Sequence, residues 1–177
     1  MRVLLVNGSP HPRGCTYTAL AEAAKTLNAE GIESEIFGLG TAPLAGCTAC
    51  GHCARAGRCV FDDRVNDFLA IAGDADGFVF GSPVHYAAAG GAMTSFMDRV
   101  FYANGSAGLN CFRLKPAACV VSARRAGTTA ALDQLLKYLT ISEMPVISSR
   151  YWVMVHGSTP EEVQQDLEGL QTVRIMA

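Results

Sequence analysis

The chain has 177 residues, of which 50% are hydrophobic and 17% are charged, and its formal net charge at pH 7 is −2. This length suits one domain with a substantial buried core, and the composition excludes a disordered chain. The weak negative charge leaves no broad basic surface for a polyanion, so no nucleic acid is expected as a partner. No apolar run approaches the roughly 20 residues that a membrane-spanning helix requires, so no membrane is expected either.

The first apolar run, residues 3–6, is too short for a secretory signal peptide and predicts a buried strand that ends at Asn7-Gly8. Because no export signal is recognised, a cytoplasmic location is expected. A helix follows and runs towards Gly31, since apolar residues recur at helical spacing: Leu20, Ala23, Ala24 and Leu27. A second, weaker strand is predicted over residues 33–39.

The remaining elements alternate in the same way. Asp62 or Asp63 is expected to cap a helix that buries Val65, Phe68, Leu69 and Ala72. Further strands are predicted at residues 78–80, 117–122 and 146–155, and further helices around residues 93–101 and 132–139. A last helix is expected to begin with Thr159 as its N-cap and Pro160 as its first residue.

Apolar strands that are each followed by an amphipathic helix indicate an α/β fold with a parallel sheet covered on both faces. We predict a doubly wound, five-stranded parallel sheet with the flavodoxin-like strand order 2-1-3-4-5. No internal repeat or linker interrupts the chain. A single flavodoxin-like domain is therefore expected over residues 1–177, with a cysteine-rich loop at residues 46–61.

The first strand runs into the segment NGSPHPRGCTYTAL, residues 7–20. In an open parallel sheet, ligands bind beyond the carboxyl ends of the strands, near the point where the strand order reverses. Gly14 permits close approach of the backbone, and the start of the following helix offers free N–H groups to an anion. The segment lacks both a Walker A lysine and a GxGxxG pattern, so it suits a monophosphate; an ordinary Gly/Pro-rich turn is the alternative.

Two further segments share this edge of the predicted sheet. GSPVHYAAAGGAM, residues 81–93, follows the third strand, and SARRAGTT, residues 122–129, follows the fourth. Together they supply backbone groups, a histidine–tyrosine pair and two arginines around one crevice. A flat ring is expected to lie there, with its phosphate at the start of the first helix.

These three segments, each at a strand end, resemble those of the NADPH-dependent FMN reductase family of flavodoxin-like proteins. The resemblance covers nearly the whole chain and implies bound FMN, with NAD(P)H as a donor and a homodimer or homotetramer as the assembly. It implies that the FMN phosphate lies on Ser9, Gly14, Cys15, Thr16 and Thr18. It implies that the isoalloxazine ring contacts Pro83, Val84, His85 and Tyr86 on one side, and Ser122, Ala123, Arg124 and Gly127 on another.

Two positions depart from the family pattern. An aromatic residue is common where His85 stands, and a polar residue is usual in place of Cys15. Cys15 is expected to act through its backbone, because an adjacent phosphate opposes a thiolate. Hydride transfer is the chemistry of the flavin itself, so no catalytic side chain is assigned.

Four of the seven cysteines, Cys47, Cys50, Cys53 and Cys59, fall within GCTACGHCARAGRCVF, residues 46–61. The spacing Cys-x2-Cys-x2-Cys-x5-Cys differs from the two separated pairs of most zinc sites. It resembles the cysteine motif of the iron–sulfur flavoproteins, a branch of the same group, which implies that the four thiolates hold a [4Fe–4S] cluster. A zinc site and a redox disulfide remain alternatives.

The sequence thus predicts an FMN-dependent oxidoreductase. Its electrons would come from NAD(P)H, or from a ferredoxin-like donor through the cluster, and would pass to a small acceptor: a quinone, an oxygen species or a flavin. The alternative is a non-catalytic flavin electron carrier or redox sensor whose cysteines form a disulfide or a zinc site. A metal-structured binding module without flavin is a third hypothesis, and it requires the three strand-end segments to be coincidental.

Overall fold

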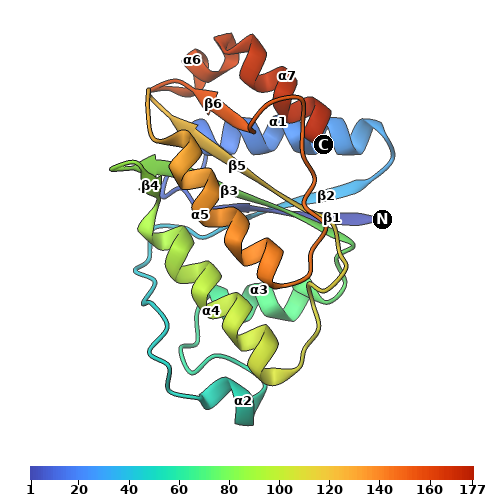
Figure 1. Cartoon of the computed structure of the whole chain (residues 1–177), viewed down its shortest axis with the longest axis vertical. Helices are drawn as coiled ribbons and strands as arrows, with labels where there is room; N and C mark the ends of the chain where they lie inside the picture. Colours follow the sequence, from blue (N-terminus) through green and yellow to red (C-terminus); the bar gives the residue numbers. More distant parts are fainter.

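The computed structural model describes all 177 residues and has a parallel sheet at its centre (Figure 1). The strands lie in the order β2-β1-β3-β5-β6: β2 (Glu33–Gly38), β1 (Arg2–Asn7), β3 (Gly77–His85), β5 (Ala117–Ala123) and β6 (Met154–His156). A sixth strand, β4 (Ala88–Ala89), pairs antiparallel with the end of β3. The predicted order 2-1-3-4-5 is confirmed, because β5 and β6 are the predicted fourth and fifth strands.

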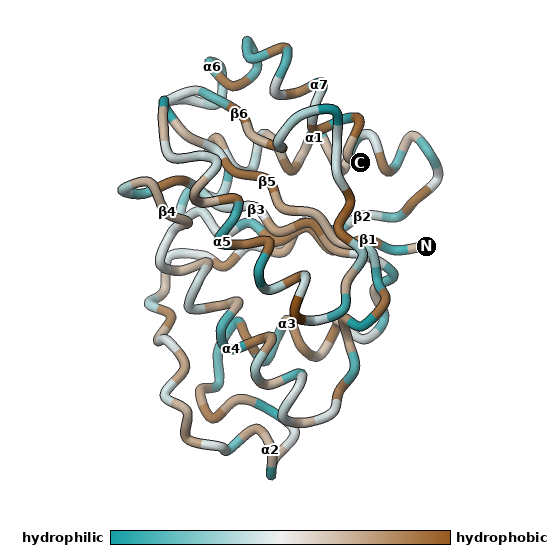
Figure 2. Tube along the Cα trace, viewed as in Figure 1, coloured by the Kyte–Doolittle hydropathy of each residue, from teal (hydrophilic) through white to brown (hydrophobic).

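Helices cover both faces of the sheet (Figure 1). One face packs against α1 (Cys15–Ala29), α6 (Pro160–Gln165) and α7 (Leu167–Met176), and the other packs against α3 (Arg64–Ala72), α4 (Gly91–Ala107) and α5 (Thr128–Ile141). Successive side chains of a strand point to opposite faces, so Leu5 and Val79 join the first core while Leu4 and Phe80 join the second. Figure 2 shows hydrophobic residues concentrated along these central strands.

The helix starts follow the predicted capping chemistry. The Asp63 carboxylate accepts a hydrogen bond of 3.1 Å from the Val65 N–H at the start of α3. The Thr159 hydroxyl accepts one from Glu162, and Pro160 is the first residue of α6. One short helix, α2 (His52–Ala56), was not predicted; it lies beside α4, far from the sheet (Figure 1). None of the helices combines the length and the apolar character that crossing a bilayer requires.

Two strand predictions need correction. The strand predicted over residues 146–155 is much shorter in the structure, because only its end, where β6 begins, pairs with β5. Residues 148–150, Ser-Ser-Arg, interrupt the apolar run, so the chain leaves the sheet after one bridge between Ala117 and Val146 and rejoins it at β6. The third strand is longer than residues 78–80, since β3 continues to His85 and forms a hairpin with β4.

Candidate functional site

The carboxyl ends of β1, β3 and β5 meet at one edge of the sheet, where most of the buried polar side chains gather. Of the eight buried polar or charged residues in the chain, six lie at this edge: Asn7, Ser9, Thr16, Ser82, Ser122 and Thr128. Burying a polar group is unfavourable unless it is hydrogen-bonded. These side chains give this edge of the sheet a polar interior.

Three contacts join the three predicted segments into one surface. The Gly8 N–H donates a hydrogen bond of 2.8 Å to the Gly81 carbonyl, which ties the first segment to β3. The hydroxyls of Thr16 and Ser122 lie 2.8 Å apart and are buried. Gly127 packs so closely on the β3–β4 hairpin that a Cβ atom there would lie 2.5 Å from the Ala87 Cα.

The first turn of α1 offers unpaired donors at this surface. Gly14 is its N-cap and supplies no side chain, and the first intrahelical bond is the one of 3.0 Å from the Thr18 N–H to the Gly14 carbonyl. The N–H groups of residues 15–17 consequently have no acceptor within the protein. Gly127 caps α5 in the same way, without a side-chain bond. Uncapped donors at a helix N-terminus are available to bind an anion.

Side chains of the phosphate segment shape its backbone. The Asn7 side-chain oxygen accepts from the Ser9 N–H at 3.1 Å, and the Ser9 hydroxyl accepts from the His11 N–H at 3.2 Å. The Ser9 hydroxyl donates no hydrogen bond within the protein. Thr18 donates its hydroxyl proton to the Gly14 carbonyl at 3.1 Å, so this side chain mainly closes the helix start.

Cys15 is the first residue of α1, and its Sγ contacts the Gly157 carbonyl at 3.6 Å. Burial raises the pKa of the Cys15 thiol. The neutral thiol is therefore favoured, and the backbone N–H of Cys15 has no acceptor within the protein.

The β3–β4 hairpin presents Tyr86 beside the third segment. Tyr86 and Ala87 form its two-residue turn with φ angles of 50° and 60°, and the Tyr86 side chain is fully exposed. Two hydrogen bonds fix the hairpin. The Gln134 side-chain oxygen accepts from the Ala89 N–H at 3.1 Å, and the Ser82 hydroxyl accepts from the Gly90 N–H at 2.9 Å. An exposed aromatic ring on a fixed hairpin is available to lie against a planar ligand.

We expect the Thr16–Ser122 contact to contribute measurably to the stability of the protein without flavin. Thr16→Val keeps the shape of the side chain but leaves the Ser122 hydroxyl buried without its only protein partner. An unsatisfied buried hydroxyl costs about 1–3 kcal/mol. Urea unfolding followed by circular dichroism measures this loss. Thr140→Val is the matched control, because the exposed Thr140 bonds only to its own helix; an equal loss in both variants would contradict the expectation.

Towards the other end of α4, all four clustered cysteines line one pocket. Their thiols are free, with Cys53 buried, Cys59 half-buried, and Cys47 and Cys50 exposed. The loop turns sharply around the pocket, because α2 is flanked by two glycines in the left-handed region with φ angles of 67° and 71°. The side chains of Arg99 and Tyr102 complete the wall from α4.

The donor set of this pocket consists of thiols, which are the ligands of iron–sulfur clusters. The four sulfurs share the pocket without meeting at one point, since no three His, Cys, Asp or Glu side chains are grouped closely enough to hold a metal ion. A hydrogen bond from the His52 backbone N–H lowers the pKa of Cys50, which favours the thiolate that metals bind. The donor chemistry of the pocket therefore suits a cysteine-ligated cluster, although its four sulfurs are not gathered around one point.

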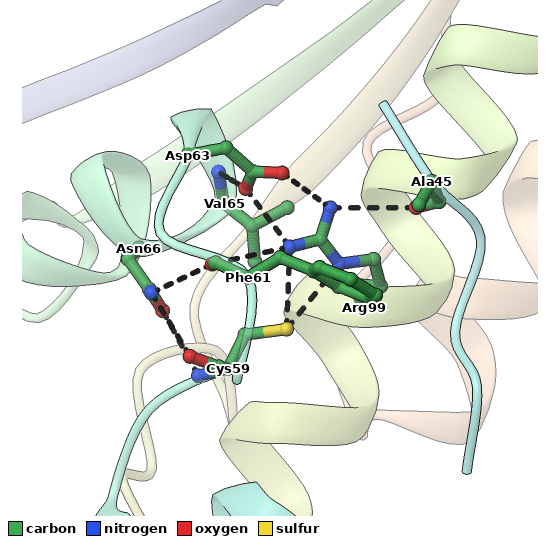
Figure 3. A network of polar contacts seen from close by, with 7 residues as sticks. All are labelled: Ala45, Cys59, Phe61, Asp63, Val65, Asn66 and Arg99. Carbon is green, nitrogen blue, oxygen red and sulfur yellow. Dashed lines mark hydrogen bonds and ion pairs between the residues drawn. The ribbon is translucent and has the colours of Figure 1, made fainter. Parts of the chain in front are cut away.

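Arg99 is a residue of this pocket that the sequence analysis did not assign. Its side chain is 1% exposed and forms two hydrogen bonds with the Asp63 carboxylate, at 2.8 and 2.9 Å (Figure 3). The same guanidinium donates two hydrogen bonds to the Cys59 Sγ, at 3.3 Å from Nε and 3.2 Å from Nη2. The spacing along the helix could have indicated that Arg99 is buried. Arg99 lies three residues after Phe96 and four before Ala103, on the buried face of α4.

The model of the family "NADPH-dependent FMN reductase" matches residues 1–159. The chain belongs to this family.

A curated relative, an iron–sulfur flavoprotein of Methanocaldococcus jannaschii, is 30% identical over 184 residues, which cover 98% of this chain and 92% of the relative. Two solved structures share the fold at 14% identity. A flavodoxin from the domain Archaea has a TM-score of 0.61 and is matched over 98% of this chain and 99% of its own. An NAD(P)H:quinone oxidoreductase from Methanothermobacter marburgensis has a TM-score of 0.68, with coverage of 98% and 94%. The flavodoxin-like fold is thus confirmed.

As a member of the NADPH-dependent FMN reductase family, the protein is an FMN-dependent oxidoreductase. FMN, when bound, supplies the hydride and electron chemistry. The start of α1 leaves backbone N–H groups free, and the β3–β4 hairpin packs against the loop after β5. Arg124 and Arg125 are exposed beside them and take part in no ion pair or hydrogen bond, so their charges are free to meet an anionic group.

Proposed function

We propose that this oxidoreductase moves electrons from NAD(P)H, or from a ferredoxin-like donor through a [4Fe–4S] cluster, to a small acceptor such as a quinone, an oxygen species or a flavin. The observation that carries the proposal is that four free cysteines line one pocket in a chain of the FMN reductase family. The cytoplasm is the expected location, because thiols stay reduced there. The whole chain, residues 1–177, would act as one FMN-binding domain.

The proposed FMN site consists of the strand-end residues that the sequence predicted. The phosphate would take hydrogen bonds from the free N–H groups at the start of α1, with the Ser9 hydroxyl and the Thr16 side chain beside them. The ring would lie between the Tyr86 hairpin and the loop after β5. The residues proposed to hold FMN are Ser9, Gly14, Cys15, Thr16, Thr18, Pro83, Val84, His85, Tyr86, Ser122, Ala123, Arg124 and Gly127.

The proposed cluster site lies along the same helix as the flavin site. Gly90, the N-cap of α4, packs on Pro83 at the predicted flavin edge, where a Cβ atom would lie 3.2 Å from the proline ring. At a rise of 1.5 Å per residue, Arg99 lies about 12 Å along α4 from Gly91. One helix therefore connects the two sites, which supports the proposal that both take part in the same electron transfer.

We also propose that the protein forms a homodimer or a homotetramer. Apolar side chains are exposed along the segment between α5 and β6 and at the end of α5: Ile141, Ile147, Tyr151 and Trp152 are 40–83% exposed. Burial of such side chains against a second copy would remove them from water. Light scattering that gives a monomer mass would contradict this proposal.

Protein purified without oxygen is expected to contain FMN together with roughly four iron and four acid-labile sulfide per flavin. Iron, sulfide and flavin are measured on the same preparation, and zinc is measured alongside them. FMN without iron would leave a flavin reductase whose cysteines serve another purpose, and zinc in place of iron would favour the structural site. Protein that neither contains nor binds FMN would contradict the proposed function as a whole.

The second candidate is an electron carrier or redox sensor without turnover of its own. The observation that favours it is that Cys47 and Cys50 are exposed and that the pKa of Cys50 is lowered, as in a reactive thiol. Stopped-flow measurements compare the reduction of bound flavin by NAD(P)H with its reduction by a reduced ferredoxin. Fast reduction by NAD(P)H with steady turnover supports the enzyme, and fast reduction only by the protein donor supports the carrier.

A further inference from the structure

The guanidinium of Arg99 is buried at the centre of a polar network that joins both arms of the cysteine loop (Figure 3). A buried charge is strongly unfavourable unless it is paired and its hydrogen bonds are satisfied. Asp63 supplies the opposite charge through both carboxylate oxygens. The carbonyls of Ala45 and Phe61 accept longer bonds, at 3.3 and 3.4 Å. The two bonds to the Cys59 Sγ complete the set of partners.

Cys59 is also fixed through its backbone. The Asn66 side-chain oxygen accepts from the Cys59 N–H at 2.9 Å, and the Asn66 amide donates to the carbonyls of Cys59 and Phe61 at 3.0 and 2.9 Å (Figure 3). Asn66 belongs to α3, and Asp63 is the N-cap of the same helix. Cys59 is thus held from two helices, α3 and α4, whereas Cys47 and Cys50 lie exposed on the loop.

We propose that Arg99 positions Cys59 as a cluster ligand and raises the reduction potential of the cluster through its two hydrogen bonds to the Cys59 sulfur. This inference rests on the proposed function, since it presumes that the four cysteines bind a [4Fe–4S] cluster. Arg99 is a positioning residue, because it acts on the cluster through Cys59. Asp63 neutralises its charge and aims its free N–H groups at the sulfur.

The direction of the effect follows from charge. Reduction adds one electron from an external donor to the cluster and leaves all four cysteine–iron bonds intact, so the negative charge on the sulfurs increases. Hydrogen bonds to cluster sulfurs are one of the factors that set the potential. N–H groups directed at the Cys59 sulfur stabilise the more negative, reduced form more than the oxidised form. Removing them makes the cluster harder to reduce.

The test compares two single substitutions in the full-length protein purified without oxygen. Arg99→Lys keeps a positive charge opposite Asp63, but a lysine lacks the planar fork that serves the carboxylate and the sulfur together. Arg58→Gln is the matched control, because Arg58 precedes Cys59 yet is exposed and pairs only with Asp62. Dithionite titration followed by electron paramagnetic resonance gives the midpoint potential, and iron and sulfide analysis gives the cluster content.

We expect Arg99→Lys to lower the equilibrium constant for one-electron reduction about tenfold, which corresponds to a midpoint about 59 mV more negative. The Arg58→Gln midpoint is expected to change by less than half of that. A full cluster with the same potential in wild type and Arg99→Lys would overturn the inference alone. Wild-type protein that contains flavin but no iron would contradict the proposal that the protein binds a cluster, and this inference would fail with it.

Two further measurements cover the case in which Arg99→Lys does not fold. The double variant Arg99→Met, Asp63→Asn removes both charges together, and asparagine remains a good cap for α3; its midpoint is expected to shift in the same direction. In wild-type protein labelled with guanidino-¹⁵N arginine, pulsed electron paramagnetic resonance of the reduced cluster is expected to show coupling to ¹⁵N. Absence of that coupling would overturn the inference that Arg99 donates a hydrogen bond to a cluster ligand.

Discussion

Gly127→Val is expected to weaken FMN binding by at least about 100-fold, or about 2.7 kcal/mol. Two effects add at this position. Gly127 has a φ of 92°, a conformation that a β-branched residue adopts only with strain, and a Cβ atom there would lie 2.5 Å from the Ala87 Cα. This clash is with the backbone of Ala87, so the hairpin that carries Tyr86 has to move away from the loop after β5. The two proposed walls of the ring site then separate.

Gly108→Val separates this effect from backbone strain. Gly108 also caps a helix, α4, with a φ of 66°, but no atom lies within 4 Å of its Cβ position. Both variants therefore carry the strain of a left-handed residue, and only Gly127→Val carries the steric clash. Flavin fluorescence during titration of the flavin-free proteins gives both dissociation constants, and circular dichroism checks the fold. Equal FMN affinity in the two variants would place the flavin away from Gly127.

The sheet and its strand order were predictable because the central strands β1, β3 and β5 contain local apolar runs and the long helices have their own periodicity. Asp63 and Thr159 were recognisable as caps for the same reason, since capping depends on residues within a few positions. The segment at residues 146–153 was not predictable in this way. Its apolar residues fit a strand, but whether they join the sheet depends on partners from β5, which sequence periodicity does not report.

For the candidate sites too, the sequence predicted local features but not the contacts between distant residues. The three strand-end segments were placed at one edge by topology alone, because parallel strands end together. The contacts that join them, such as the Thr16–Ser122 hydrogen bond and the packing of Gly127 on Ala87, connect residues far apart in the sequence. Arg99 was missed because its partners, Asp63 and Cys59, are 36 and 40 residues away. A charged residue on an apolar helix face was nevertheless a visible sign of a buried ion pair.

The largest effect on the second site is expected from Cys53→Ala, which should remove iron and leave FMN in place. Cys53 is the most buried of the four clustered cysteines and lies within α2, so neighbouring loop residues cannot readily replace its sulfur. Alanine is chosen because a serine oxygen is itself able to bind iron. With only three thiolates left to hold the cluster, the iron content is expected to fall from four atoms per flavin to well under one.

Cys111→Ala is the matched control for this loss. Cys111 is 5% exposed and Cys53 is 7% exposed, so truncation removes a sulfur of similar burial in each case. Cys111 contributes to the core beside Phe112 and lies outside the cysteine-lined pocket. Iron retained in Cys111→Ala and lost in Cys53→Ala, with equal flavin in both, assigns the cluster to the pocket. Iron retained in Cys53→Ala would exclude Cys53 as a ligand. Quantitation of free thiols after oxidation would then test for a disulfide between the exposed Cys47 and Cys50.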